Sequence, residues 1–207
     1  YIKNSINLLQ QNIEDLELII VDDNSSDKTR DIIYELNNHK KIKLIHRKKS
    51  RGLASAFLTG LIESNGGRIG WIDTNMSELI LKFKEMNNAL DEGYDIAFLS
   101  RYVEGGEDKR KLFRSLCSKY FNTVCRILLG SKIKDYTSGI FLMKRKVLDE
   151  VNFLAYGHGE FFIEFLYKLK KRGIKIKEIP YTHPPDHEGM SKTATNIFRF
   201  FKLGIDY

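Results

Sequence analysis

The chain has 207 residues, of which 42 % are apolar and 12 % aromatic, and a formal net charge of +7. This composition predicts a globular domain with a sizeable core and excludes a disordered chain. The positive charge suits nucleic acid, an anionic membrane surface or a phosphate-rich ligand. No zinc-finger spacing, helix-turn-helix pattern or RNA-binding aromatic motif accompanies the basic residues, so we expect no nucleic-acid partner.

The first half of the chain alternates between two kinds of segment. A helix-like run opens it at residues 1–11, and we expect a further strand upstream of Tyr1. Short apolar runs then predict strands at 16–23, 41–47, 68–73 and 94–101. The segments between them predict helices at 25–39, 52–66 and 77–93. This order indicates an α/β fold with a mostly parallel sheet and helices on both of its faces.

The second half is less regular, and we expect it to complete one domain over residues 1–207. Its predicted elements are a long amphipathic helix at 109–130, a strand at 138–145, a helix at 159–173, a strand at 174–182 and a polar loop at 183–192. The tail at 196–207 combines Phe with Arg and Lys, so it could lie in a membrane interface or pack on the domain.

Two features bear on the cellular setting. Cys117 and Cys125 lie in the helix-like run 109–130, and we expect free, buried thiols in a reducing compartment rather than a disulfide or metal site. No apolar run approaches the roughly 18 residues that span a bilayer. No signal peptide is recognisable at the start.

Three of the predicted strands end in polar residues, at the edge where an open α/β sheet binds its ligands. They are Asp22 with Asp23, Asp73, and Ser100 with Arg101. Carboxylates and a guanidinium at one edge suit a phosphorylated ligand with a divalent cation. An alternative for the first pair is a turn and helix start, made with Asn24, Ser25 and Asp27.

Four stretches in order resemble one known family over nearly the whole chain. They are "LELIIVDDNSSDKT" (16–29), "GYDIAFLSRYVEGGE" (93–107), "KIKDYTSGIFLMKRKVLDEV" (132–151) and "FFIEFLYKLKKRGIKIKEIPYTHPPDHEGMSK" (161–192). Together they resemble family-2 glycosyltransferases of the GT-A fold, in the dolichyl-phosphate mannosyltransferase branch. The resemblance implies a donor half at 1–101 and an acceptor half at 102–207.

The implied reaction moves mannose or glucose, with inversion, from a GDP- or UDP-sugar to a polyprenyl or dolichyl phosphate. A lipid-phosphate acceptor implies a membrane surface as partner, with the chain at the cytoplasmic face, peripheral or anchored by segments outside it. The rival expectations are a polysaccharide or other hydroxyl acceptor, and a nucleotide-sugar-binding module with impaired catalysis.

The family's D-x-D motif corresponds to Asp73-Thr74-Asn75, and its Pro-Pro step is absent before Glu78. The resemblance therefore implies that Asp73 and Asn75 hold Mg²⁺ or Mn²⁺. An Asn oxygen can ligate the ion but brings no charge, which weakens binding by about 1–3 kcal/mol. We expect a weakened site, a retuned one or lost activity. The alternative for Asp73 is a helix N-cap.

The resemblance also assigns roles to individual residues. Those implied in catalysis are Asp73, Arg101 and Asp135; Asp135 could orient the acceptor, act as a base, or form a turn before Thr137. Those implied in donor binding are Asp22, Asp23, Arg51, Gly52, Asp73, His187 and Lys192. Those implied in holding the acceptor phosphate are Arg101, Arg114, Lys119 and Ser138. His183, His187 and Asp186 also suggest a metal site faintly, although their spacing fits no zinc motif.

Overall fold

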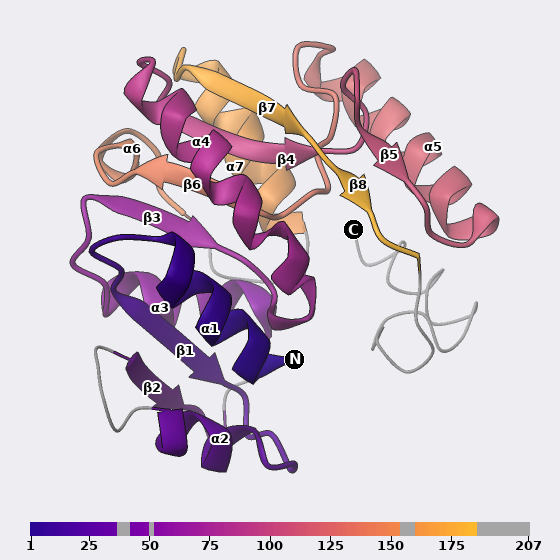
Figure 1. The fold of residues 1–207 in the computed structure, drawn as a ribbon. Helices are drawn as coiled ribbons and strands as arrows, with labels where there is room; N and C mark the ends of the chain where they lie inside the picture. Colours follow the sequence, from indigo (N-terminus) through magenta and orange to yellow (C-terminus); the bar gives the residue numbers. More distant parts are fainter. Residues whose placement is uncertain (37–41, 50–51, 154–159, 186–207) are drawn as a thin grey trace.

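A computed structural model describes residues 1–36, 42–49, 52–153 and 160–185 (Figure 1). The α/β prediction is confirmed, and the elements in chain order are α1 (Ile2–Asn12), β1 (Leu18–Asp22), α2 (Thr29–Leu36), β2 (Ile42–His46), α3 (Leu53–Ile62), β3 (Arg68–Trp71), the 3₁₀ helix η2 (Thr74–Leu81), α4 (Lys82–Asp91), β4 (Ile96–Ser100), β5 (Glu107–Asp108), α5 (Leu112–Leu129), β6 (Phe141–Lys144), α6 (Val147–Glu150), α7 (Glu160–Lys171), β7 (Ile176–Pro180) and β8 (Thr182–His183).

The strands form three sheets. β1 and β2 pair in parallel, β5 and β8 pair in parallel, and the central sheet has the order β3-β6-β4-β7. β6 is antiparallel to both β3 and β4, whereas β4 and β7 are parallel. The prediction of a mostly parallel arrangement is confirmed, with β6 as the antiparallel strand among those described. Its first residue, Phe141, pairs with Phe98 and Trp71 near the carboxyl ends of β4 and β3, so the chain enters β6 from that edge.

Helices cover both faces of the central sheet, as the continuous apolar sequence of β4 requires. β4 is buried along its whole length. Ile96 and Phe98 pack in one apolar cluster with α3 and α7, and Ala97 and Leu99 pack in a second cluster with α4. Alternate residues of a strand point to opposite faces, so an apolar run without alternation is what a strand covered on both sides needs.

A third apolar cluster joins α1 and α2 to β1 and β2, and α1 also contacts η2. The Ser5 hydroxyl donates to the Thr74 carbonyl oxygen at 2.9 Å, and the Asn4 amide donates to Ser77 Oγ at 3.0 Å. The first helix thereby fixes the segment that follows β3, which carries Asp73 and Asn75.

Two expectations about cysteine and membrane segments can be compared with the structure. Cys117 and Cys125 are free thiols, and Cys125 is buried while Cys117 is partly exposed. Within the described residues, no helix combines the length and the hydropathy that crossing a bilayer requires. The expected tail helix at 196–207 lies outside the described residues.

Candidate functional site

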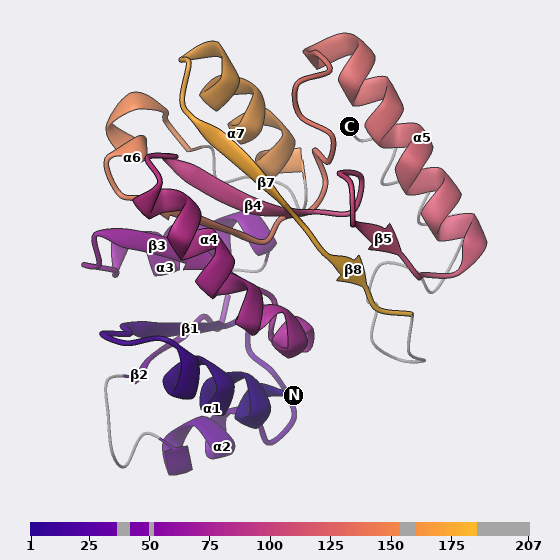
Figure 2. The same ribbon diagram turned by 45° about the horizontal axis from the view of Figure 1, so that its top comes forward.

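The carboxyl ends of β1, β3 and β4 face the same side of the molecule (Figure 2). β3 and β4 share this direction because both are antiparallel to β6. Asp22 ends β1, Asp73 comes two residues after β3, and Arg101 comes directly after β4. The polar residues predicted at this edge therefore do lie along it, as the parallel strands require.

Asp22 is buried and its carboxylate is held by local contacts. The Ser25 backbone N–H donates to its Oδ1 at 3.1 Å, and His46 Nδ1 lies 3.0 Å from Oδ2. Asn24, which lies between Asp22 and Ser25 in the sequence, adopts a left-handed φ of 61°. Burial alone would raise the pKa of Asp22, but the hydrogen bonds from Ser25 and His46 outweigh it and the pKa lies below its ordinary value. The turn expected as an alternative role is present.

Asp23 and Arg47, a residue that sequence analysis missed, together fix the start of α3. Arg47 Nε donates to Asp23 Oδ1 at 2.7 Å, and the Gly52 backbone N–H donates to Oδ2 at 3.0 Å. Arg47 also donates to Ser55 Oγ at 3.0 Å. Gly52 has a φ of 132°, which favours glycine. Asp23 and Gly52 thus lie together, and a role in donor binding stays a prediction for both.

Asp73 occupies the N-cap position of η2 but makes no capping hydrogen bond through its side chain. Within the described residues, no hydrogen bond or ion pair holds its carboxylate or the side chain of Asn75. Asp73 is exposed at the surface, and the protein atoms around it still desolvate its carboxyl enough to raise the pKa. An uncommitted carboxylate and, two positions later in the sequence, an amide oxygen are the hard oxygen ligands that Mg²⁺ and Mn²⁺ prefer.

Arg101 and Asp135 form a buried ion pair beneath the end of β4. Only 4 % of Arg101 and none of Asp135 is exposed. Arg101 Nε and Nη2 each donate to the carboxylate at 2.8 Å, and Nη2 also donates to Thr137 Oγ1 at 2.7 Å. The Thr137 backbone N–H donates to Asp135 Oδ1 at 3.1 Å, which forms the turn expected before Thr137. Burial alone would lower the pKa of Arg101, but the hydrogen bonds and charge of Asp135 outweigh it and raise that pKa.

A basic cavity of about 300 Å³ lies between the loop after β4 and helix α5. It brings together Arg101 and Lys119, two residues predicted to hold an acceptor phosphate, whereas Arg114 and Ser138 do not line it. Its lining residues include no acidic side chain and are Arg101, Tyr102, Val103, Gly106, Lys119, Asn122, Thr123, Arg126 and Lys134.

Sequence analysis missed Arg126 and Lys134 in this cavity. Arg126 lies seven residues after Lys119 on the same helix, so the two share one face, and that spacing could have identified it. Arg126 Nε is buried without a hydrogen-bond partner in the described part of the chain. Ser138 Oγ, outside the cavity, is likewise buried and unpaired there. A buried donor without a partner is a candidate ligand contact.

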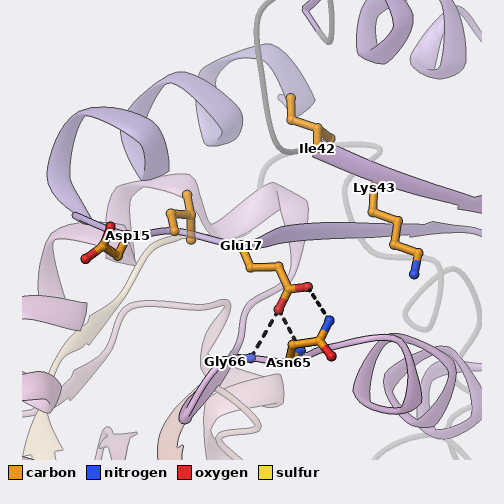
Figure 3. Close-up of a pocket in the computed structure, with 7 residues that line it drawn as sticks. Asp15, Glu17, Ile42, Lys43, Asn65 and Gly66 are labelled. Atoms are coloured by element: carbon orange, nitrogen blue, oxygen red, sulfur yellow. Dashed lines mark hydrogen bonds between the residues drawn. The ribbon is translucent and has the colours of Figure 1, made fainter.

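A larger cavity of about 660 Å³ lies at the opposite, amino-terminal ends of β1 and β2 (Figure 3). Glu17 projects into this region and accepts hydrogen bonds from the backbone N–H groups of Asn65 at 2.7 Å and Gly66 at 3.2 Å. The bond from Asn65 is the main cause that lowers the pKa of Glu17. This carboxylate ties the segment before β1 to the segment before β3, and we assign it a structural role.

Comparison with known proteins identifies the family to which the chain belongs. The sequence profile described as "Glycosyl transferase family 2" matches residues 1–151. This chain belongs to glycosyl transferase family 2. The family resemblance predicted from the sequence is confirmed.

Two relatives in this family are similar to most of the chain. The dolichol-phosphate mannosyltransferase of Pyrococcus furiosus is 33 % identical over 190 residues, which cover 90 % of this chain and 53 % of that protein. The polyprenol monophosphomannose synthase of Mycolicibacterium smegmatis is 30 % identical over 194 residues, which cover 89 % of this chain and 72 % of that protein. The chain thus spans about half the length of the Pyrococcus relative.

Solved structures share the fold of this chain. A glucosyl-3-phosphoglycerate synthase from Mycobacterium tuberculosis, in complex with Mn²⁺, UDP and glucosyl-3-phosphoglycerate, superposes with a TM-score of 0.69 at 17 % identity. The match covers 98 % of this chain and 70 % of that one. At this identity the likeness concerns the fold alone.

Several predicted site residues lie outside the described part of the family-2 domain. They are Arg51, Asp186, His187 and Lys192. His183 is described, and burial lowers the pKa of its imidazole. No three His, Cys, Asp or Glu side chains cluster as metal ligands within the described ranges. The metal site suggested by His183, His187 and Asp186 therefore stays untested.

The Asp108 carboxylate provides a pH prediction for this domain. Its side chain is 4 % exposed and pairs with Arg110, whose Nε lies at 2.7 Å, and with Arg101 at 3.7 Å. Burial opposes ionisation, but hydrogen bonding and charge from Arg110 lower the pKa from 3.8 to about 2. A lowered carboxyl pKa stabilises the fold above the unfolded-state value, and this stabilisation is lost as the pH falls from about 4 to 2.

We therefore expect Asp108→Asn to flatten the acid dependence of stability. Urea unfolding at pH 7, 4 and 3 should show that the variant loses less stability than the wild type on acidification, by about 1–2 kcal/mol. The exposed Asp149 offers a matched Asp149→Asn control, which should follow the wild type. Identical acid profiles for Asp108→Asn and the wild type would contradict the ion-pair assignment.

Proposed function

We propose that this chain transfers a hexose, with inversion, from a nucleoside diphosphate sugar to a polyprenyl phosphate. The observation that carries the proposal is the uncommitted Asp73 carboxylate at the carboxyl edge of the sheet, in a chain of glycosyl transferase family 2. Relatives named for mannose transfer to dolichol phosphate and polyprenol phosphate support this acceptor class.

The donor half, residues 1–101, would supply the cation and sugar-nucleotide contacts. Asp73 and Asn75 would hold Mg²⁺ or Mn²⁺ through oxygen ligands. The cation, when bound, neutralises negative charge on a diphosphate leaving group. Asp22 and Asp23 are held by the turn at Ser25 and by Arg47. They shape this edge, and partly exposed Asp23 retains a face for the donor.

The acceptor half, residues 102–207, would supply positive charge for a second phosphate. Lys119, Arg126 and Lys134 line the cavity beside α5. A phosphomonoester acceptor is already an anion near pH 7, so it needs cations to hold it near the donor more than it needs a base. Asp135 is fully engaged with Arg101, and we assign this pair a positioning role under the cavity. With such an acceptor, the chain would work at the cytoplasmic face of a membrane.

Asn75 favours a second candidate function, a nucleotide-sugar-binding module with impaired catalysis. An amide at the second position of the metal motif removes one negative charge from the cation site. Both candidates bind the donor, and only the enzyme turns it over. A hydroxyl acceptor remains the alternative within the enzyme class.

Calorimetric titration of the full chain with GDP and UDP, with and without Mn²⁺, tests the proposal. We expect Mn²⁺-dependent binding of one nucleotide, and sugar transfer from the matching donor to a short-chain polyprenyl phosphate. Binding without turnover would favour the module, and no binding of either nucleotide would overturn both candidates.

Asn75→Asp tests whether this side chain faces the cation. The added charge should tighten Mn²⁺ binding by about 1–3 kcal/mol, which is roughly five- to 150-fold in affinity. The control Asn152→Asp adds the same charge at an exposed position after α6 and should leave Mn²⁺ affinity unchanged. Equal Mn²⁺ affinity in wild type and Asn75→Asp would place Asn75 away from the cation.

A further inference from the structure

Glu178 places a carboxylate among apolar residues of the central sheet. It lies in β7, the edge strand of that sheet, and pairs with Phe98 of β4. Paired residues of neighbouring strands point to the same face, and Phe98 belongs to the apolar cluster that includes α7. Burial there raises the pKa of the Glu178 carboxyl. A carboxylate in such surroundings needs hydrogen bonds that compensate for its desolvation.

The two carboxylate oxygens of Glu178 bind two successive backbone groups. Oε2 accepts the backbone N–H of Lys134 at 2.8 Å, and Oε1 accepts that of Asp135 at 3.1 Å. Both residues belong to the connection between α5 and β6. A carboxylate suits this task because each of its oxygens is an acceptor, whereas a Gln amide has one acceptor oxygen and would turn an NH₂ group toward the second N–H.

Side chains also bind the next two N–H groups of this connection. Asn122 of α5 accepts the backbone N–H of Tyr136 at 2.7 Å, and Asp135 Oδ1 accepts that of Thr137 at 3.1 Å. The four N–H groups of residues 134–137 are thus bound by side chains and not by a neighbouring strand. Residues 134–137 lie in neither a helix nor a strand, so these side chains decide the path of the backbone.

The connection between α5 and β6 shapes the basic cavity beside α5. Lys134 lines this cavity together with Lys119 and Arg126. Asp135 binds Arg101, another lining residue, through two hydrogen bonds of 2.8 Å. A shift of the backbone at residues 134 and 135 would therefore move one cation of the cavity and the counter-charge of a second.

We propose that Glu178 is a positioning residue for the acceptor phosphate. From outside the cavity, its carboxylate sets the backbone so that the side chains of Lys134 and Arg101 serve one ligand. This role rests on the proposed function, in which that ligand is a phosphomonoester. It also predicts a sign: loss of a negative charge near an anion site should by itself tighten anion binding, whereas displacement of Lys134 should weaken it.

Calorimetric titration of the full chain with farnesyl phosphate tests this role without turnover. We expect Glu178→Gln to bind farnesyl phosphate at least about tenfold more weakly than the wild type, because one charge-assisted hydrogen bond to the backbone is lost. The matched control is Glu17→Gln, since Glu17 also accepts two successive backbone N–H groups, those of Asn65 and Gly66. This control lies at the amino-terminal ends of β1 and β2 and should bind farnesyl phosphate as the wild type does.

A double variant separates positioning from a general loss of structure. If Glu178 acts through Lys134, adding Glu178→Gln to Lys134→Ala should weaken farnesyl phosphate binding by no more than about threefold further. Full multiplication of the two single effects would overturn the role.

A measurement on the wild type keeps the proposal testable if circular dichroism shows that Glu178→Gln fails to fold. Hydrogen exchange should show protected N–H groups at Lys134 and Asp135, although both lie outside helices and strands. Rapid exchange at both N–H groups would overturn the positioning role.

The outcomes distinguish the positioning role from the proposed function. Farnesyl phosphate binding by Glu178→Gln that equals or exceeds wild-type binding would overturn the positioning role alone. A wild-type chain that binds no farnesyl phosphate would overturn the role together with the proposed acceptor. Weakened binding by Glu178→Gln, in a chain that transfers no sugar, would support the role and contradict the proposed function.

Discussion

Asp135→Asn is expected to lower the free energy of unfolding by about 3–5 kcal/mol, because it leaves the Arg101 guanidinium buried without its counter-charge. Both side chains are inaccessible, with 3 % of Arg101 and none of Asp135 exposed. The carboxylate also accepts the backbone N–H groups of Arg101 at 3.0 Å and Thr137 at 3.1 Å. Urea unfolding at pH 7, followed by circular dichroism, measures the loss.

Two control variants separate the buried charge from the loss of one contact. Removing both charges in Arg101→Met, Asp135→Leu should cost less than the two single changes added together, since no uncompensated charge remains. Glu63→Gln breaks an exposed ion pair, in which the Lys43 side chain is 51 % and the Glu63 side chain 43 % exposed. This change should lower the free energy of unfolding by less than about 1 kcal/mol. If Asp135→Asn cost no more than Glu63→Gln, the ion pair would contribute little to the fold.

The sequence predicts elements where local pattern is sufficient. The apolar run at 94–101 contains β4, because a strand covered on both faces must be apolar throughout. The direction of β6 was not predictable, since a strand reads the same in either orientation and its pairing depends on where the preceding connection ends. The predicted helix at 77–93 corresponds to the end of η2, which begins earlier at Thr74, and to α4, which begins at Lys82.

The candidate site shows the same limit. The strand-end positions of Asp22, Asp73 and Arg101 follow from the strands themselves and were predicted. The partners that engage two carboxylates were not, because Arg47 lies 24 residues from Asp23 and Arg101 lies 34 residues from Asp135. Such distant pairs form only when the sheet places their strands together. Local pattern therefore located charged groups at the edge but could not tell which remain available to a ligand.

Asp73→Asn is expected to reduce sugar transfer at least about a hundredfold, because it removes the charged ligand proposed to hold the cation near the leaving diphosphate. The same change should slightly raise the stability of the metal-free protein at pH 7. Desolvation raises the pKa of the Asp73 carboxyl, so ionisation at neutral pH opposes folding, and a neutral side chain removes that opposition. The gain is small because Asp73 is exposed to solvent, which screens the charge.

For Asp73→Asn we expect lower sugar transfer and higher stability of the metal-free protein. This combination distinguishes a cation ligand from a structural carboxylate. A capping carboxylate would stabilise η2, and its replacement would lower the melting temperature; the side chain makes no such bond. Mn²⁺ should raise the melting temperature of the wild type through binding to the folded state alone, should raise that of Asn75→Asp further, and should leave Asp73→Asn unchanged. A Mn²⁺-induced rise in Asp73→Asn equal to that in the wild type would place the cation elsewhere, and the proposed role of Asp73 would then fail even if transfer were lost.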